Sequence, residues 1–274
     1  MERNLQLLQD TAKKVRKNII TMLTASASGH PGGSLSAVEI LTTLYFHEMK
    51  VDPKDPHNAD RDRFVLSKGH AAPAIYSVLA EKGYFDKAEL VGLRKTGSML
   101  QGHPNMNYVP GVDMSTGSLG QGVSTAVGMA IAGKLDKKDY RVYTLLGDGE
   151  LEEGQVWEAS MCAAHYKLDN LTAFVDYNGL QIDGNISDVM SPEPISNKFE
   201  AFNWHVICVD GHDFNALIDA IEEAKTVKGK PTMVVCKTVK GKGVSFMENE
   251  ASWHGTAPNQ EQCEKALQEI GGEA

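Results

Sequence analysis

The sequence predicts an α/β fold in which a mostly parallel sheet is covered by helices on both faces. In the second half of the chain, short apolar runs alternate with helical patterns, which is typical of parallel strands joined by crossover helices. The 274 residues are 42% hydrophobic and 23% charged, an ordinary globular composition. We find no repeat, low-complexity tract or clear linker, so we expect one domain over residues 1–274, with a loop and helical tail from 240 to 274.

Apolar residues at helical spacing predict several helices in the first half of the chain. Two irregular stretches are expected where Gly and Pro cluster, at residues 28–34 and 97–122. A short apolar run at residues 64–66 precedes the segment Ser67-Lys68-Gly69-His70. The predicted helices of this half span residues 1–25, 35–48, 72–82 and 86–95.

The second half gives the strands of the predicted sheet. Each is a short apolar run, and each is bounded by turn residues or followed by a helical pattern. The predicted strands span residues 140–146, 171–177, 204–209 and 232–238. The predicted helices span residues 123–135, 152–167, 213–226 and 259–269.

The net charge is −9, from 27 Lys and Arg against 36 Asp and Glu. An acidic chain repels phosphate backbones, so we expect no nucleic acid partner. No stretch approaches the roughly 20 apolar residues that span a bilayer, and residues 1–17 lack the apolar core of a signal peptide. We therefore expect no membrane partner and a cytoplasmic location.

The four cysteines lie far apart and form no CxxC pair. Reduced thiols are expected, without a disulfide or metal role. Cys208 and Cys236 fall inside predicted strands, where we expect them to be buried. The other two are Cys162 and Cys263.

Two predicted strands end in oxygen-bearing side chains. Gly147-Asp148-Gly149 follows strand 140–146, and Asn178 follows strand 171–177. Open parallel sheets bind ligands at the carboxyl ends of their strands, and Mg²⁺ prefers oxygen ligands, some of them from phosphate. The pair therefore predicts a magnesium–diphosphate site. Taken separately, Asp148 could instead cap the next helix and Asn178 could occupy a left-handed turn.

With these motifs in place, the sequence resembles the N-terminal, diphosphate-binding part of transketolases over nearly the whole chain. The spacing GDG-x₂₈-N is the thiamine diphosphate fingerprint, and five further motifs occur in the order that the family shows. They are Ser28-Gly29-His30-Pro31-Gly32, Ser67-Lys68-Gly69-His70-Ala71, Gly102-His103-Pro104, the run from Thr116 to Gly122, and His254-Gly255. The resemblance implies a thiamine diphosphate-binding fold and a single diphosphate-binding domain.

The resemblance also implies which residues hold the cofactor and its metal. Mg²⁺ or Ca²⁺ would be bound by the side chains of Asp148 and Asn178 and by the backbone carbonyl of Leu180. Gly117 and Gly149 would approach thiamine diphosphate with their backbones. The cofactor-binding residues implied in this way are His70, Gly117, Ser118, Leu119, Gly147, Asp148, Gly149, Glu150 and Asn178.

The nine histidines divide into ligand-loop and structural candidates. His30, His70, His103 and His254 adjoin glycines, which let a backbone approach a ligand closely. In transketolases the matching positions surround the diphosphate and the first carbons of the sugar. The resemblance therefore implies that His70 contacts the diphosphate, and that His30, His103 and His254 are catalytic. We expect structural roles for His47, His57, His165 and His205. His212 also follows a glycine, after a predicted strand, and both roles stay open for it, with a structural role favoured.

The segment Lys240-Gly241-Lys242-Gly243 is rich in Lys and Gly but lacks the spacing of a nucleotide-binding loop. We expect it to be a flexible lid before His254. The order of glycines from Gly117 to Gly122 reverses the dinucleotide pattern, which argues against a nicotinamide cofactor.

A transketolase also needs a pyrimidine-binding domain and a third domain, and nothing after His254 is long enough to form them. The resemblance therefore implies one subunit of a split enzyme, with a C-terminal partner subunit in an α₂β₂ assembly. Its reaction would transfer a two-carbon ketol unit from a ketose to an aldose, with sugar phosphates or related sugars as substrates. Three alternatives stay open: a subunit of a 2-oxo acid dehydrogenase, a deoxyxylulose-phosphate synthase, and a non-catalytic subunit that only binds cofactor.

Overall fold

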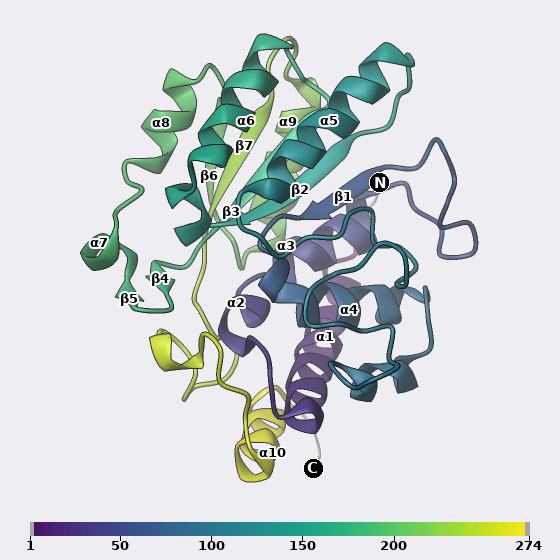
Figure 1. Ribbon diagram of the computed structural model, residues 1–274, viewed down its shortest axis with the longest axis vertical. Helices are drawn as coiled ribbons and strands as arrows, with labels where there is room; N and C mark the ends of the chain where they lie inside the picture. Colours follow the sequence, from purple (N-terminus) through teal and green to yellow (C-terminus); the bar gives the residue numbers. More distant parts are fainter. Residues whose placement is uncertain (1–2, 272–274) are drawn as a thin grey trace.

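The computed structural model describes residues 3–271 and confirms the predicted α/β architecture (Figure 1). Its main sheet has five strands in the order β1-β2-β3-β7-β6, and every neighbouring pair is parallel. The last strand in sequence, β7, lies between β3 and β6. The strands are β1 (Arg63–Leu66), β2 (Val142–Gly147), β3 (Leu171–Tyr177), β6 (His205–Asp210) and β7 (Thr232–Lys237).

Helices cover both faces of this sheet, as Figure 1 shows. Side chains alternate along each strand, so Val142 and Leu146 of β2 enter one core and Tyr143 and Leu145 enter the other. The first core is closed by α5 (Gln121–Leu135), α6 (Gly154–His165) and α8 (Ile195–Ala201). The second is closed by α1 (Leu5–Ser26), α3 (Val38–Thr43), α4 (Ala72–Lys82), α9 (Phe214–Thr226) and α10 (Gln260–Glu269).

Local signals explain where the longer helices begin and end. Asn4 caps α1 by accepting the backbone N–H of Leu7 at 3.0 Å, and Ala27 follows the last residue of α1 in the left-handed conformation. Asp213 caps α9 in the same way through the N–H of Asn215. The predicted helix over residues 72–82 coincides with α4, which ends at Gly83.

The prediction of a loop over residues 28–34 is wrong, because Pro31–Leu35 form the short helix α2. Proline at the first position has a backbone angle suited to a helix start. The following glycines serve close packing: a Cβ on Gly32 would lie 2.9 Å from Lys240 Cγ, and one on Gly33 would lie 3.2 Å from Lys68 Nζ. Gly32 and Gly33 are therefore explained by close packing against lysine side chains and not by a turn.

Three smaller expectations also change. Residues 86–95 contain a 3-10 helix at Lys87–Gly92, and residues 35–48 divide into α3 and a π-helical turn at Leu44–Glu48. All four cysteines are free, as predicted, but Cys208 is exposed. The prediction that Cys208 is buried is wrong because β6 is an edge strand, paired on one side only by β7.

Two connections leave the sheet and bring further residues to its carboxyl end. After β3 the chain forms a hairpin of β4 (Leu180–Gln181) and β5 (Gly184–Asn185), followed by α7 (Ile186–Val189). After β7 it runs back against α2, where the N–H of Gly241 donates to the carbonyl of Gly32 at 3.0 Å. Within residues 3–271 no helix has the length and apolar character needed to cross a membrane.

Candidate active site

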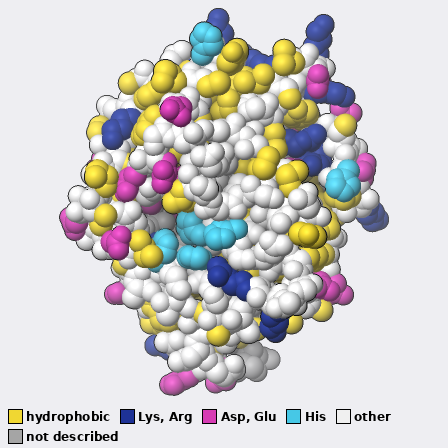
Figure 2. Space-filling view, in the orientation of Figure 1, with side chains coloured by type: hydrophobic (Ala, Val, Ile, Leu, Met, Phe, Trp, Pro, Cys, Tyr) yellow, Lys and Arg dark blue, Asp and Glu magenta, His cyan; other side chains and the backbone are white. Residues whose placement is uncertain are grey.

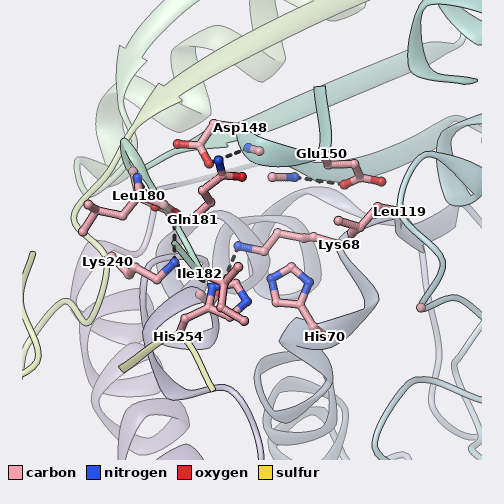
Figure 3. A pocket seen from close by; sticks show the side chains of 15 residues that line it. Lys68, His70, Leu119, Asp148, Glu150, Leu180, Gln181, Ile182, Lys240 and His254 are labelled. Atoms are coloured by element: carbon pink, nitrogen blue, oxygen red, sulfur yellow. Dashed lines mark hydrogen bonds between the residues drawn. The ribbon is translucent and has the colours of Figure 1, made fainter. Parts of the chain in front are cut away.

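A cavity of about 260 Å³ lies at the carboxyl ends of β1, β2 and β3, next to α2 and the tail (Figure 3). Ten of the thirteen site residues expected from the sequence line it, and His30, His103 and Ser118 do not. The lining residues are Gly33, Lys68, His70, Gly117, Leu119, Gly147, Asp148, Gly149, Glu150, Asn178, Leu180, Gln181, Ile182, Lys240 and His254.

Asp148 stands where β2 ends, and its carboxylate is buried. One oxygen accepts the N–H of Gly149 at 2.8 Å and the other accepts the N–H of Gly179 at 2.6 Å. Burial, followed by the nearby charge of Asp176, raises the pKa of Asp148 to about 6. A buried carboxylate with only neutral donors is therefore poised to gain from a bound cation.

Two more oxygens lie on the same wall, from the turn after β3. The side-chain oxygen of Asn178 accepts the N–H of Leu180 at 3.1 Å, and the carbonyl of Leu180 accepts from Lys240 Nζ at 2.9 Å. A carbonyl oxygen has two lone pairs, so the Leu180 oxygen keeps one acceptor position beside Lys240.

This donor set fits a hard divalent cation. Mg²⁺ and Ca²⁺ take carboxylate, amide and carbonyl oxygens and complete their shells with water or phosphate. In the described part of the chain, no group of three or more His, Cys, Asp or Glu residues is placed to hold a metal. A cation here would depend on Asp148, Asn178 and Leu180 together with oxygens of a bound ligand.

Glu150 also lines the cavity, but its carboxylate is already bonded within the chain. It accepts the N–H groups of Gly120 at 2.8 Å and Gly147 at 3.0 Å, and also the hydroxyl of Ser67. Burial raises the pKa of this carboxyl. Glu150 thus ties the ends of β1 and β2 to the start of α5, and this fixes the loops around the cavity.

Three histidines from distant segments form a cluster at the cavity. The ring centroids of His30 and His70 lie 5.4 Å apart, those of His30 and His254 lie 5.5 Å apart, and those of His70 and His254 lie 5.3 Å apart. Figure 2 shows histidine side chains gathered near the middle of one face, with basic side chains close by. The Nδ1 atom of His30 is buried without a hydrogen-bond partner in the described residues, so its hydrogen-bonding capacity is not used within them.

Burial, and then positively charged neighbours, keep these imidazoles neutral. Burial, and then the charge of Arg94, lowers the pKa of His30 to about 4. Burial, and then the charge of Lys240, lowers the pKa of His254 to about 3. Burial, followed by the charge of Lys68, holds the pKa of His70 well below its ordinary value. At neutral pH each ring therefore has one donor and one acceptor nitrogen.

His103 and Ser118 lie beside the cavity and not in its lining. A Cβ on Gly117 would lie 3.0 Å from the His103 ring, and Gly117 itself has a φ of 152°. Both observations explain why glycine occupies that position. The carbonyl of His103 accepts the Tyr76 hydroxyl at 2.9 Å, and the carbonyl of Ser118 accepts the N–H of Gln121 at the start of α5.

Sequence reasoning missed two lysines. Lys68 is buried and forms an ion pair with Asp176, a carboxylate that also accepts the hydroxyls of Ser36 and Thr238. Burial raises the pKa of Asp176, but the charge of Lys68 and the hydrogen bonds from Lys68, Ser36 and Thr238 together outweigh it, and the net pKa is lowered. Lys68 lies two residues before the predicted His70, in the same motif, and this position was the signal that could have identified it. Gly33, Gln181 and Ile182 also line the cavity without having been predicted.

Lys240 is the second missed lysine, and it is buried at the cavity. Its Nζ lies 2.9 Å from the carbonyl of Leu180 and 3.0 Å from Nδ1 of His254. Burial, and then the charge of Lys68, lowers the pKa of Lys240 to about 8. The sequence predicts a flexible lid at residues 240–243. In the structure the side chain of Lys240 is instead buried and held by these two contacts.

Comparisons with known proteins agree with this geometry. Residues 8–274 match the family described as transketolase, thiamine diphosphate binding domain. The chain is 46% identical over 263 residues to the 6-deoxy-6-sulfo-D-fructose transketolase subunit SqwG of Clostridium sp. (strain MSTE9), with 96% of each chain covered. It is 43% identical over 265 residues to the A subunit of the apulose-4-phosphate transketolase of Phocaeicola vulgatus, covering 97% of this chain and 94% of that one.

The fold is also that of solved transketolases. The crystal structure of transketolase from Campylobacter jejuni aligns with a TM-score of 0.93 and 35% sequence identity. The alignment covers 99% of this chain and 44% of that one, so the chain spans less than half the length of this relative. The chain therefore belongs to the transketolase family, of which it forms the thiamine diphosphate-binding domain.

Proposed function

We propose that this chain, acting as one diphosphate-binding domain, is the subunit of a split transketolase that transfers a two-carbon ketol unit from a ketose to an aldose. The observation that carries the proposal is that two kinds of groups line one cavity. They are the oxygens of Asp148, Asn178 and Leu180, and the neutral rings of His70 and His254. The oxygens suit a metal-bound diphosphate, and neutral imidazoles suit hydrogen bonds to the diphosphate side from His70 and to sugar hydroxyls from His254.

In this proposal Asp148, Asn178 and Leu180 hold Mg²⁺, with Ca²⁺ as the alternative ion. When bound, thiamine diphosphate supplies a nucleophilic carbon that accepts the two-carbon unit from one sugar and delivers it to another. His70 and the backbones of Gly117 and Gly149 contact the diphosphate side of that ligand. The remaining cofactor contacts are those expected from Ser118, Leu119, Gly147 and Glu150.

His30, His103 and His254 act on the sugar in this proposal. Each neutral imidazole can donate a hydrogen bond from one nitrogen to a carbonyl and accept one from a hydroxyl at the other. Burial, and then the positive charges of Arg94 at His30 and Lys240 at His254, disfavour the imidazolium form, so a proton taken up by these two rings is released readily. This property supports a role in orienting the donor sugar and in passing protons during transfer.

The partner we propose is a second polypeptide that carries a pyrimidine-binding domain and a third domain, in an α₂β₂ assembly. Two relatives that this chain matches over nearly their full length are named as transketolase subunits. The partner would supply the glutamate that contacts the aminopyrimidine of thiamine, and most contacts to the far end of the sugar.

We further propose that the substrates are anionic sugars, with sugar phosphates of pentose phosphate metabolism in the cytoplasm as the default. The names of the two subunit relatives specify a sulfonated and a phosphorylated sugar. The shared core is compatible with either class, since specificity for the anionic end would come from the partner.

Native mass spectrometry of the chain purified from its own host tests this function. The expected result is a complex with a second polypeptide, thiamine diphosphate and a divalent ion, and mixing the two subunits should give ketol transfer. The isolated chain should show no turnover. Robust turnover by this chain alone would disprove the split-enzyme proposal, and decarboxylation of 2-oxo acids by the complex would favour a different thiamine enzyme.

The variant His103→Ala separates catalysis from binding. We expect it to bind thiamine diphosphate like the wild type, because His103 lies beside the cavity and not in its lining. We expect it to lose most ketol transfer in the complex, because His103 is proposed to act on the sugar. Full activity of this variant would contradict the catalytic role of His103. Absence of any activity in the wild-type complex would favour a purely cofactor-binding subunit.

A further inference from the structure

Lys240 enters the cavity from a segment without regular structure. Residues 239–243, called the lysine loop below, follow β7 and lie against α2 and α1. A buried ammonium is costly unless it is hydrogen-bonded or paired with an opposite charge, so the position of Lys240 Nζ relative to its acceptors matters. Lys240 Nζ makes two contacts of its own, and the backbone of the lysine loop makes further contacts that hold the loop in place.

His212 holds the start of the lysine loop. The backbone N–H of Val239 donates to Nε2 of His212 at 2.9 Å, and Nδ1 of His212 lies 2.8 Å from Oε2 of Glu39. Because a backbone N–H can only donate, Nε2 must be the acceptor and Nδ1 must carry the proton that bonds to Glu39. The two contacts together require the neutral Nδ1–H tautomer of His212.

Arg16 holds the other end of the same loop. Its Nε donates to the carbonyl of Lys242 at 3.0 Å, and a Cβ on Gly243 would lie 3.0 Å from the Arg16 side chain. Its Nη2 lies 2.6 and 2.8 Å from the two oxygens of Glu39. The exposed fractions of the Arg16, Glu39 and His212 side chains are 9%, 8% and 14%, so the network is largely shielded from water.

Glu39 is the common partner of both anchors. It comes from α3, Arg16 comes from α1 and His212 follows β6, so three separate elements meet at one carboxylate. Burial raises the pKa of Glu39, but the charges and hydrogen bonds of Arg16 and His212 together outweigh it, and the net pKa is lowered. Glu39 is thus ionised and orients both side chains toward the loop.

We propose that Arg16, Glu39 and His212 are positioning residues that fix the lysine loop at both ends and so set the place of the Lys240 amine in the cavity. None of the three lines the cavity. His212 and Arg16 contact the backbone of residues 239 and 242, and Glu39 orients both. The three residues therefore act on the ligand site only through the lysine loop.

Two variants of His212 test the proposal, because each keeps one of its two bonds. In His212→Asn the side-chain amide can keep the contact to Glu39 but has no atom in place of Nε2, so the Val239 N–H loses its acceptor. In His212→Gln the side-chain oxygen can replace Nε2 as acceptor. His205→Asn is the matched control, since it breaks a 2.7 Å histidine–glutamate contact with Glu223 at the other end of β6.

Two readouts need neither ligand nor partner. Amide hydrogen exchange at Val239 should become about tenfold faster in His212→Asn and stay near the wild-type rate in His212→Gln and His205→Asn. The imidazole NMR signals of His254, whose Nδ1 lies 3.0 Å from Lys240 Nζ, should shift in His212→Asn alone. A failure of the transketolase assignment would leave both readouts intact.

Unchanged Val239 exchange or unchanged His254 signals in folded His212→Asn would overturn the proposal. If that variant does not fold, Glu39→Gln removes the shared charge at constant shape and should release both ends of the loop. The wild-type protein gives a further test through the ¹⁵N shifts of His212. An Nε2–H tautomer in those spectra is incompatible with the proposed network.

Discussion

The carboxylate of Asp148 accepts the backbone N–H of Gly179 at 2.6 Å, and this bond joins the ends of the neighbouring strands β2 and β3. The same side chain therefore shapes the turn that carries Asn178 and presents charge to the cavity. A variant that removes the charge while keeping an oxygen can separate these two roles.

Asp148→Asn is that variant. We expect it to remain folded and to lose at least about tenfold in Mg²⁺-dependent affinity for thiamine diphosphate, because the charge that attracts the cation is gone. Titration calorimetry with and without Mg²⁺ measures the effect. Asp139→Asn, an exposed carboxylate before β2, is the control and should bind like the wild type. Equal Mg²⁺ dependence in the two variants would rule out the proposed metal site.

Stability should fall in acid because of His30. Its pKa is about 4 in the folded chain against roughly 6.5 when unfolded, so the unfolded state binds more protons below pH 6.5. The stabilisation is present above that pH and is lost as the pH falls toward 4. Between pH 7 and pH 5 the wild type should lose about 1–2 kcal/mol more unfolding free energy than His30→Gln does. Urea titrations at the two pH values measure this, and parallel losses would show that His30 is not held neutral.

Two glycines of α5 should respond oppositely to alanine. A Cβ on Gly122 would lie 2.6 Å from Ser67 Cα, so the backbone at the end of β1 would have to shift. We expect Gly122→Ala to cost about 2–3 kcal/mol of unfolding free energy. Gly128 has nothing within 4 Å of its Cβ position, and Gly128→Ala should gain up to about 1 kcal/mol from helix propensity. Chemical denaturation of both proteins checks the contrast, and similar changes in the two would refute the packing argument.

Breaking the buried Lys68–Asp176 pair should lower the free energy of unfolding far more than breaking a surface ion pair. Lys68→Met leaves the fully buried Asp176 without its cation, which should cost about 3–5 kcal/mol. The loss should be smaller at pH 5, because an Asp176 deprived of Lys68 can then take up a proton. Lys87→Met removes the half-exposed partner of Glu81 and should cost less than about 1 kcal/mol. Comparable losses in thermal or urea unfolding would contradict this ranking.

The sheet was predictable from the sequence because its strands are continuous apolar runs. The predicted strand 171–177 coincides with β3, and the runs around residues 142, 205 and 232 needed shifts of only one or two residues. Polar residues that follow such runs must lie at one edge of a parallel sheet. This rule alone was sufficient to predict that Asp148 and Asn178 share one wall.

Other features depended on contacts that no local pattern encodes. The glycines of the helix at Pro31–Leu35 pack closely against Lys240 and Lys68, and both lysines are distant in sequence. Lys240 looks like a surface residue in a Lys- and Gly-rich segment, but α1, α2 and the turn after β6 contact its loop and bury it. Cys208 lies in an apolar run, but edge position is decided by strand order, which the run itself does not reveal.

Strand order also has a consequence for how the chain folds while it is being synthesised on the ribosome. Strands β1, β2 and β3 can pair in the order of their synthesis, but β6 emerges before its partner in the described sheet, β7, has been made. An apolar strand with open hydrogen-bonding groups must therefore wait until residue 237 is available. Lys240 and His254 follow directly afterwards, so the cavity closes in the last stage of folding. A nascent chain interrupted before β7 would carry an open strand edge and no assembled site, which makes it a target for proteolysis and not a partly active enzyme.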